Sequence, residues 1–121
     1  MPTAGPIQIF GVPNDQATRA AQRFFKERRA AISFVDLRRK PIAPGELRRF
    51  VERLGARALA DTEGRQWLDA GLGYLSMDDA ELSQRLLTDQ RLLRLPLVRA
   101  GNAVSAGRDE AAWKRMTAGS G

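Results

Sequence analysis

The sequence contains neither cysteine nor histidine, so carboxylates are its main candidates for acid–base or metal chemistry. The absence of both residues excludes disulfides, thiol redox chemistry, zinc and iron–sulfur sites, imidazole catalysis, and Cys–His or Ser–His nucleophiles. A magnesium or calcium site built from carboxylates alone stays open. Asp78 and Asp79 form an adjacent acidic pair, but they stand where a helix is predicted to begin, and carboxylates stabilise that end of a helix. We interpret them as a helix start and expect neither a metal nor a cofactor.

The chain is strongly basic. Its 20 lysine and arginine residues outnumber 14 aspartate and glutamate residues, which gives a net charge of +6. Such a charge favours nucleic acid or an acidic protein as a partner. Basic and acidic residues alternate along the predicted helices, however, as is typical of solvated helix faces. Trp67, Tyr74 and Trp113 do not alternate with basic runs as stacking aromatics do, so we interpret them as core residues and keep nucleic-acid binding as an alternative.

The length of 121 residues is that of one domain whose core needs no disulfide or metal. No apolar run approaches the roughly 18 residues that cross a bilayer. Residues 1–6 contain neither a basic start nor an apolar stretch, so we predict no secretory signal. We expect a monomeric, cytoplasmic protein without membrane contact, a single domain over residues 1–121 with a flexible tail at 118–121.

The first third of the chain predicts a strand, a helix and a second strand. Residues 7–10 are apolar and are followed by Gly11 and Pro13, which indicates a strand that ends in a turn. Residues 15–29 carry apolar groups at helical spacing after Asn14 and Asp15, which are both good N-caps. Residues 31–37 are rich in β-branched and aromatic side chains. This order favours a parallel pair of strands with a right-handed crossover.

The middle of the chain predicts helices. Leu47, Phe50, Val51 and Leu54 repeat at helical spacing between a proline at the predicted helix start, Pro44, and Gly55, which ends the helix. Residues 56–71 predict short helical pieces, and another helix should begin at Asp78 or Asp79 and run to about Gln90. The side chains expected to face the core are Leu59, Trp67, Leu68, Leu82, Leu86 and Leu87.

The last third predicts a hairpin and a helix. Pro96 cannot donate to a sheet, so a strand should start at or just after it. Gly101-Asn102 indicates a tight turn into a returning strand at 103–106. Asp109 should cap a final helix that buries Ala112, Trp113 and Met116. The whole order predicts an α/β fold with a mixed four-stranded sheet: β-α-β, a helical insertion at about 43–90, then β-β-α.

Three segments in this order resemble the arsenate reductase-like family of thioredoxin-fold proteins (ArsC, Spx and YffB types). They are the strand and turn at 7–14, the glycine turn before an aromatic at 62–67, and the proline-containing strand at 91–98 with Gly101 and Gly107 after it. The resemblance covers about residues 6–117. It implies a thioredoxin-like fold and a cis peptide bond between Leu95 and Pro96. Members include glutaredoxin-dependent arsenate reductases and Spx-type regulators, which bind bacterial RNA polymerase.

The chain departs from this family where the family does its chemistry. The nucleophilic cysteine would follow Asn14, and Asp15 stands there instead. The family's mid-chain arginine falls near Glu63, and its arginine before the strand proline is replaced by Leu95. Arg94 lies one position away, but side chains alternate along a strand, so it should point elsewhere. The resemblance thus implies a pocket beside Asp15 and Pro96, lined by Asn14, Arg94, Leu95 and Pro96, that has lost its thiol and its anion-binding arginines.

We therefore predict a non-catalytic member of the family that acts through protein contacts, with RNA polymerase as a partner by analogy alone. The candidate contact surface consists of basic residues on two predicted segments, Arg38, Arg39, Lys40, Arg48, Arg49 and Arg53. One alternative is an enzyme with altered chemistry, in which Asp15 acts as base or nucleophile beside Arg65 and Arg94. The other is nucleic-acid binding through the basic surface.

Overall fold

The computed structural model describes residues 6–118 and contains one mixed sheet of four strands. The spatial order of the strands is β2-β1-β3-β4, with β1 parallel to β2, and with β3 antiparallel to both β1 and β4. Their bounds are β1 Ile7–Gly11, β2 Ile32–Asp36, β3 Leu97–Ala100 and β4 Ala103–Ala106. The predicted sheet and its chain order are confirmed.

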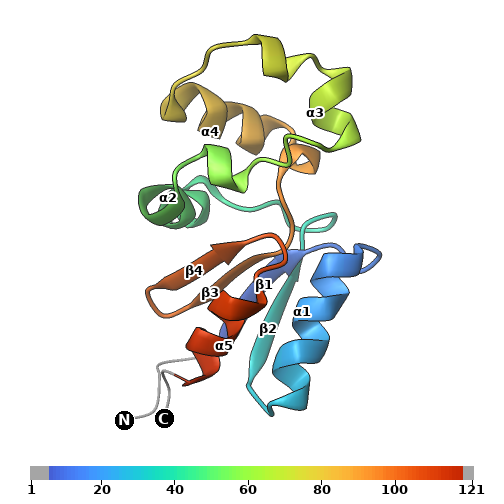
Figure 1. Cartoon of the computed structure of the whole chain (residues 1–121), viewed down its shortest axis with the longest axis vertical. Helices are drawn as coiled ribbons and strands as arrows, with labels where there is room; N and C mark the ends of the chain where they lie inside the picture. The colour runs from blue at the N-terminus through green and yellow to red at the C-terminus, as the bar shows by residue number, and fades with distance from the viewer. Residues whose placement is uncertain (1–5, 119–121) are drawn as a thin grey trace.

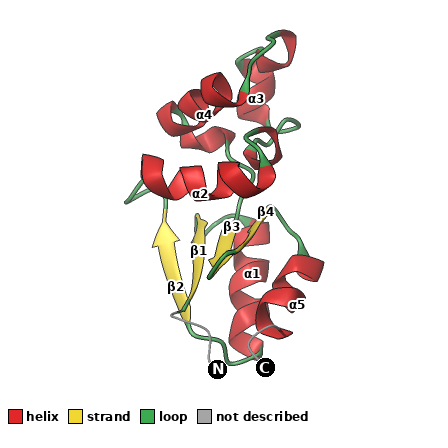
Figure 2. Ribbon diagram, turned by 90° about the vertical axis from the view of Figure 1, so that its left-hand side faces the viewer, coloured by secondary structure: helices red, strands yellow, loops and turns green. Residues whose placement is uncertain are grey.

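The helices form two groups, one against a face of the sheet and one beyond its end. α1 (Gln16–Glu27) and α5 (Glu110–Ala118) lie side by side against one face of the sheet (Figures 1 and 2). The other helices gather beyond the end of the sheet where β1 and β2 finish (Figure 1). They are α2 Pro44–Leu54, α3 Arg65–Asp69 and α4 Asp79–Thr88, with the 3-10 turns η1 Arg57–Leu59, η2 Leu72–Tyr74 and η3 Gln90–Leu92.

Side-chain alternation along the strands divides the core into two clusters. Ile9 of β1 and Val98 of β3 face α1 and α5, where they join a cluster built around Trp113. Their neighbours Phe10 and Leu97 face the other way and pack with the helical region. Because successive side chains of a strand point to opposite faces, each strand holds both halves of the molecule together.

The hairpin and the helix ends form as their residues predict. Gly101 adopts a positive φ of 62° in the two-residue turn that pairs Ala100 with Ala103. Asp109 accepts a hydrogen bond from the Ala112 amide at the start of α5, and Gly55 ends α2. The peptide bond before Pro96 is cis. The tail expected at 118–121 lies outside the described residues, apart from Ala118 at the end of α5.

Two predicted core residues are wrong. Leu68 is 65% exposed and Tyr74 is 96% exposed, whereas the neighbouring Trp67 is buried. Both lie where regular helix gives way to single turns: Leu68 near the end of the five-residue α3, and Tyr74 at the end of η2. A helix of one or two turns is too short for apolar residues to recur along one face. The spacing of apolar residues therefore does not predict which side chains of such a helix point inward. No helix of residues 6–118 is long and apolar enough to span a membrane.

Candidate functional site

Asp15 caps the N-terminus of α1. Its Oδ2 atom accepts hydrogen bonds from the backbone N–H and from the hydroxyl of Thr18, both at 2.8 Å. Thr18 is fully buried, and a Cβ atom added to Gly11 would overlap its side chain, so the end of β1 packs directly on the start of α1. The carboxylate therefore occupies the amide that an anionic ligand or a thiolate would use at this helix end.

Thr18 is the member of this cluster that sequence reasoning missed. A signal was available, because a cap side chain accepts from the third residue of the helix, and a threonine there can donate its hydroxyl to the same carboxylate. Its burial, however, depends on contact with Gly11 of β1. That contact requires the tertiary fold and cannot be inferred from local spacing.

We expect Asp15→Ala to lower the free energy of unfolding by about 1–3 kcal/mol, because it removes a helix cap and leaves a buried hydroxyl without a partner. In a Thr18→Val background the same change should cost about 1 kcal/mol or less, since the hydroxyl is then already absent. Urea unfolding of the four proteins measures both values. Equal costs in the two backgrounds would mean that the Asp15–Thr18 side-chain bond adds nothing.

A hollow of about 820 Å³ opens between the loop after β1, the loop after β2, and η3. Its apolar lining residues are Val12, Leu37, Pro41, Leu87 and Leu95. Of the pocket residues implied by the resemblance, Leu95 lines this hollow, whereas Asn14, Arg94 and Pro96 do not. Asn14 is exposed and Pro96 is buried in the core.

The two arginines of this hollow are each held by a neighbouring carboxylate. Arg38 donates from Nε and Nη2 to the two oxygens of Asp36, both at 3.2 Å. Arg91 donates in the same way to Asp89, at 2.9 and 3.0 Å. These hydrogen bonds lower the pKa of Asp36 and of Asp89 from the ordinary value of 3.8. Each cation is therefore already paired with a carboxylate, which weakens its attraction for an oxyanion.

The Asp89–Arg91 pair predicts a small acid sensitivity. Because folding lowers the pKa of Asp89, its stabilisation is complete above the ordinary value of 3.8 and is lost as the pH falls through the folded value. Asp89→Asn should cost a few tenths of a kcal/mol at neutral pH, since the pair is exposed to solvent, and should remove part of the decline below about pH 4. Urea unfolding across this range tests it, with Asp69→Asn as control, because Asp69 is exposed and forms no ion pair with residues 6–118. A decline unchanged in Asp89→Asn would contradict it.

Arg94 points to another part of the molecule. It contributes to a hollow of about 330 Å³ bounded by β4 and α5, and a Cβ atom added to Gly107 would lie 2.6 Å from its Cδ. Arg65, the other cation considered near Asp15, is the exposed first residue of α3 in the helical region (Figure 1). The structure therefore does not gather the cations of an altered catalytic site around Asp15.

The six basic residues of the predicted contact surface are all exposed, but they do not share one hollow. Arg38 lines the hollow beside Leu95, and Arg49 and Arg53 line another one, at the β3–β4 turn. Arg38 and Arg49 have carboxylate partners, Asp36 and Glu46. The remaining four form no ion pair with any residue of 6–118: Arg39, Lys40, Arg48 and Arg53.

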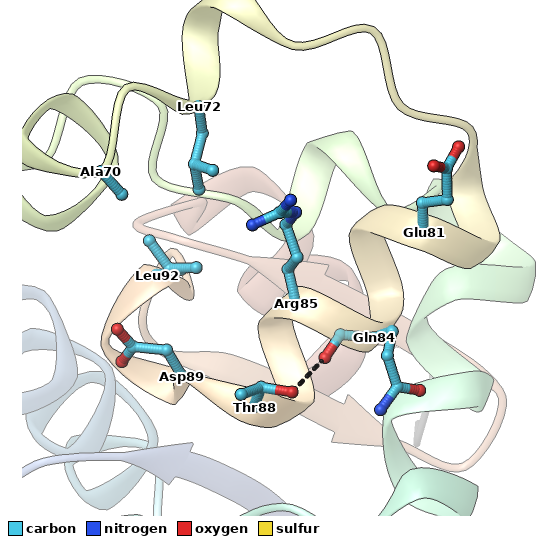
Figure 3. A pocket seen from close by; sticks show the side chains of 8 residues that line it. All are labelled: Ala70, Leu72, Glu81, Gln84, Arg85, Thr88, Asp89 and Leu92. Atoms are coloured by element: carbon cyan, nitrogen blue, oxygen red, sulfur yellow. Dashed lines mark hydrogen bonds between the residues drawn. The ribbon is translucent and has the colours of Figure 1, made fainter.

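A further hollow of about 520 Å³ lies within the helical region, between η2 and α4 (Figure 3). Arg85 extends from α4 toward Leu72, and the Thr88 hydroxyl donates to the Gln84 carbonyl at 2.9 Å. Of its two carboxylates, Asp89 is paired with Arg91, and Glu81 accepts from the Asp78 amide. With a single cation left unpaired, this hollow has no convergent set of groups for chemistry.

The carboxylates at the start of α4 serve structural roles. Asp78 and Glu81 form a capping box at the start of α4, and Asp79 accepts a hydrogen bond from the Ala56 amide at 3.3 Å. The interpretation of the acidic pair as a helix start is thereby confirmed. Within residues 6–118, no group of three or more carboxylates is placed to hold a metal ion.

Solved structures share this architecture. The YFFB (PA3664) protein is 17% identical, with a TM-score of 0.84 over 92% of this chain and 98% of that one. The arsenate reductase from Vibrio cholerae is 19% identical, with a TM-score of 0.78 over 89% of this chain and 95% of that one. An arsenate reductase (ArsC) related protein from Brucella melitensis is 16% identical, with a TM-score of 0.66 over 94% and 96% of the two chains. At these identities the likeness shows the thioredoxin-like fold alone.

Comparison with curated protein sequences gives no match. The sequence model of the ArsC family, in contrast, matches residues 10–116, from the end of β1 to the last helix. The match therefore includes the capped start of α1, the ion-paired Arg38 and Arg91 beside Leu95, and the strand after the cis proline. The chain belongs to the ArsC family.

Proposed function

We propose that this ArsC-family protein is non-catalytic and acts through contacts with another protein. The observation that carries the proposal is the carboxylate of Asp15 at the start of α1, bonded to the amide and hydroxyl of Thr18. It stands where the family resemblance places the reactive thiol, in a chain without cysteine. The scaffold is retained and the group that would react is absent.

The chemistry of this replacement supports the proposal. A thiolate is a strong nucleophile that a helix N-terminus stabilises. A carboxylate uses the same amide but cannot form a disulfide or an arsenic–sulfur bond. Its negative charge also repels an oxyanion, and the arginines of the nearby hollow, Arg38 and Arg91, are bound to carboxylates. The nucleophile is thus absent, and the nearby cations are already paired with carboxylates of the chain.

The exposed cations support contact with an acidic protein surface. Arg39, Lys40, Arg48 and Arg53 are exposed and have no ion-pair partner in residues 6–118. Unpaired cations raise the rate and the specificity of association with an acidic partner. Analogy to Spx-type regulators makes RNA polymerase one partner of this class.

Nucleic acid is the weaker alternative on this structure. The exposed aromatic side chain of Tyr74 could stack on a base. It lies, however, in the segment 57–85, which carries three arginines and six carboxylates. A polyanion would be repelled from the part of the surface that offers the aromatic ring.

Affinity capture from extract of the source cells tests the proposal. Wild type should retain a partner that is lost when Arg39, Lys40, Arg48 and Arg53 are all changed to glutamate. A matched control changes four other exposed cations to glutamate, Arg19, Arg23, Lys26 and Lys114, which likewise have no ion pair within the described residues 6–118, and it should retain the partner. Capture of no partner by wild type, or equal loss in both variants, would count against recognition through this surface.

A further inference from the structure

The strand β4 forms one edge of the sheet (Figure 1). The Gly107 amide donates to the Pro96 carbonyl at 3.0 Å, so these two residues are a hydrogen-bonded pair. Bonded and non-bonded pairs alternate in an antiparallel ladder. The pair Val98–Ser105 is therefore bonded, and the backbone groups of Val104 and Ala106 point away from β3. No described residue bonds these outward groups.

The residues of β4 lack two of the usual protections against pairing. Native sheets block their edges with charged side chains, prolines, bulges or covering segments. The four residues of β4, Ala103, Val104, Ser105 and Ala106, include neither a charge nor a proline. Its small side chains leave room for another strand to approach.

Hollows flank β4 along its length. One of about 150 Å³ lies between Val104 and the last turns of α2, beside Arg49 and Arg53. A second, of about 330 Å³, runs past Val104, Ser105 and Ala106 to Ala112 and Arg115 of α5. Val104 borders both hollows, and the two hollows together are called the channel below.

The charges around this channel are mainly positive. Five arginines line the two hollows, against two carboxylates, Glu52 and Asp109. The arginines are Arg49, Arg53, Arg94, Arg99 and Arg115. Arg49 and Arg99 share Glu46, at 3.7 and 4.0 Å, and Asp109 caps α5. Arg53, Arg94 and Arg115 have no ion pair with residues 6–118.

The charge decides between possible occupants. A second copy pairing through its own β4 would bring the same arginines against these, and that repulsion disfavours a dimer. An extended acidic segment would satisfy the outward backbone groups and also pair with the free arginines. Addition of a strand to a sheet edge obtains affinity from backbone bonds and specificity from flanking side chains.

We propose that β4 binds an acidic, extended peptide segment of a partner protein as a fifth strand. The proposal rests on the proposed function in one respect, the existence of a protein partner, and names the surface and the chemistry of that partner. Arg49 and Arg53 of α2 belong both to this channel and to the basic surface considered above.

The test uses a fluorescent peptide of alternating glutamate and valine, about eight residues long, the length of a typical added strand with overhang. A lysine–valine peptide of equal length is the matched control. The glutamate peptide should bind, with affinity that falls as salt is raised, and should slow hydrogen exchange at the amides of Val104 and Ala106. The lysine peptide should not bind.

Two variants locate the site. Ala106→Pro removes an outward N–H without touching the β3–β4 ladder, and Arg53→Glu with Arg115→Glu reverses two free cations. Each should weaken binding about tenfold or more, a change of roughly 1.4 kcal/mol. Arg23→Glu on the exposed face of α1 should leave binding unchanged. The second variant keeps the test valid if the proline change unfolds the protein.

Three results would overturn the proposal. The first two are that the glutamate peptide does not bind, and that it protects amides outside β4 from hydrogen exchange. The third is that Val104 and Ala106 become protected without peptide as the protein concentration rises, which would indicate a dimer. None of them concerns catalysis or the other contact residues. Failure here therefore leaves a non-catalytic protein that binds its partner through another surface, whereas turnover by the protein would remove the proposed function itself.

Discussion

Asp15→Cys is expected to produce a thiol whose pKa lies at least about one unit below the ordinary cysteine value of about 8.5. The side chain at this position meets the first amides of α1, and Asp15 already uses the Thr18 amide. These amides and the helix dipole stabilise a thiolate as they stabilise the carboxylate. At neutral pH, alkylation by iodoacetamide should be about five- to tenfold faster than for an ordinary thiol, since the larger thiolate fraction is partly offset by its lower nucleophilicity.

Because the chain contains no cysteine, each variant contains a single thiol, and the alkylation rate reports on that thiol alone. Asp69→Cys is the control: it replaces an exposed aspartate at the C-terminal end of α3, whereas Asp15 is half-buried at the N-terminal end of α1. The pH dependence of alkylation gives both pKa values directly. Equal values would show that position 15 is not placed to activate a nucleophile, so that aspartate there would not mark a lost catalytic site.

Trp113→Ala should cause the largest loss of stability, about 3–5 kcal/mol. Trp113 is fully buried, with its ring centroid 5.5 Å from that of Phe24 and 6.1 Å from that of Phe25. Its removal opens a cavity at the centre of the cluster that joins α1, α5 and the sheet. A domain of this size is stable by about 5–15 kcal/mol, so the loss is a large share of the total.

Tyr74→Ala is the matched aromatic truncation and should change the free energy of unfolding by less than about 0.5 kcal/mol, because the side chain is 96% exposed. Urea unfolding compares the two. If Trp113→Ala does not fold, Trp113→Phe supplies a milder change at the same site. Similar costs at residues 74 and 113 would contradict the burial seen in the structure.

The regular elements could be predicted from the sequence because each carries a local signal. The Gly101-Asn102 turn, the proline at the start of α2 and the apolar spacing of α1 all act over a few residues. The observed strands at 7–11, 32–36 and 103–106 lie within a residue of the predicted ranges. The cis bond at Pro96 came from the family resemblance and not from any local signal.

The site was less predictable because its properties depend on contacts between elements. Thr18 is buried by Gly11 of β1. The pairing of Arg38 with Asp36, and of Arg91 with Asp89, neutralises the cations beside Leu95. Both pairs join residues only two apart, so the partners were visible in the sequence, but the shared hollow was not. The exposure of Tyr74 likewise follows from the single-turn geometry of η2.

Turnover by the purified protein is the most direct test of the account. The assay supplies arsenate or a glutathione mixed disulfide, together with glutathione and glutaredoxin, and compares wild type, Asp15→Ala and a blank without protein. With a capped carboxylate in place of the thiol, wild type should give a rate equal to the blank. A rate above the blank that disappears in Asp15→Ala would contradict the account, because it would show that this carboxylate performs the chemistry.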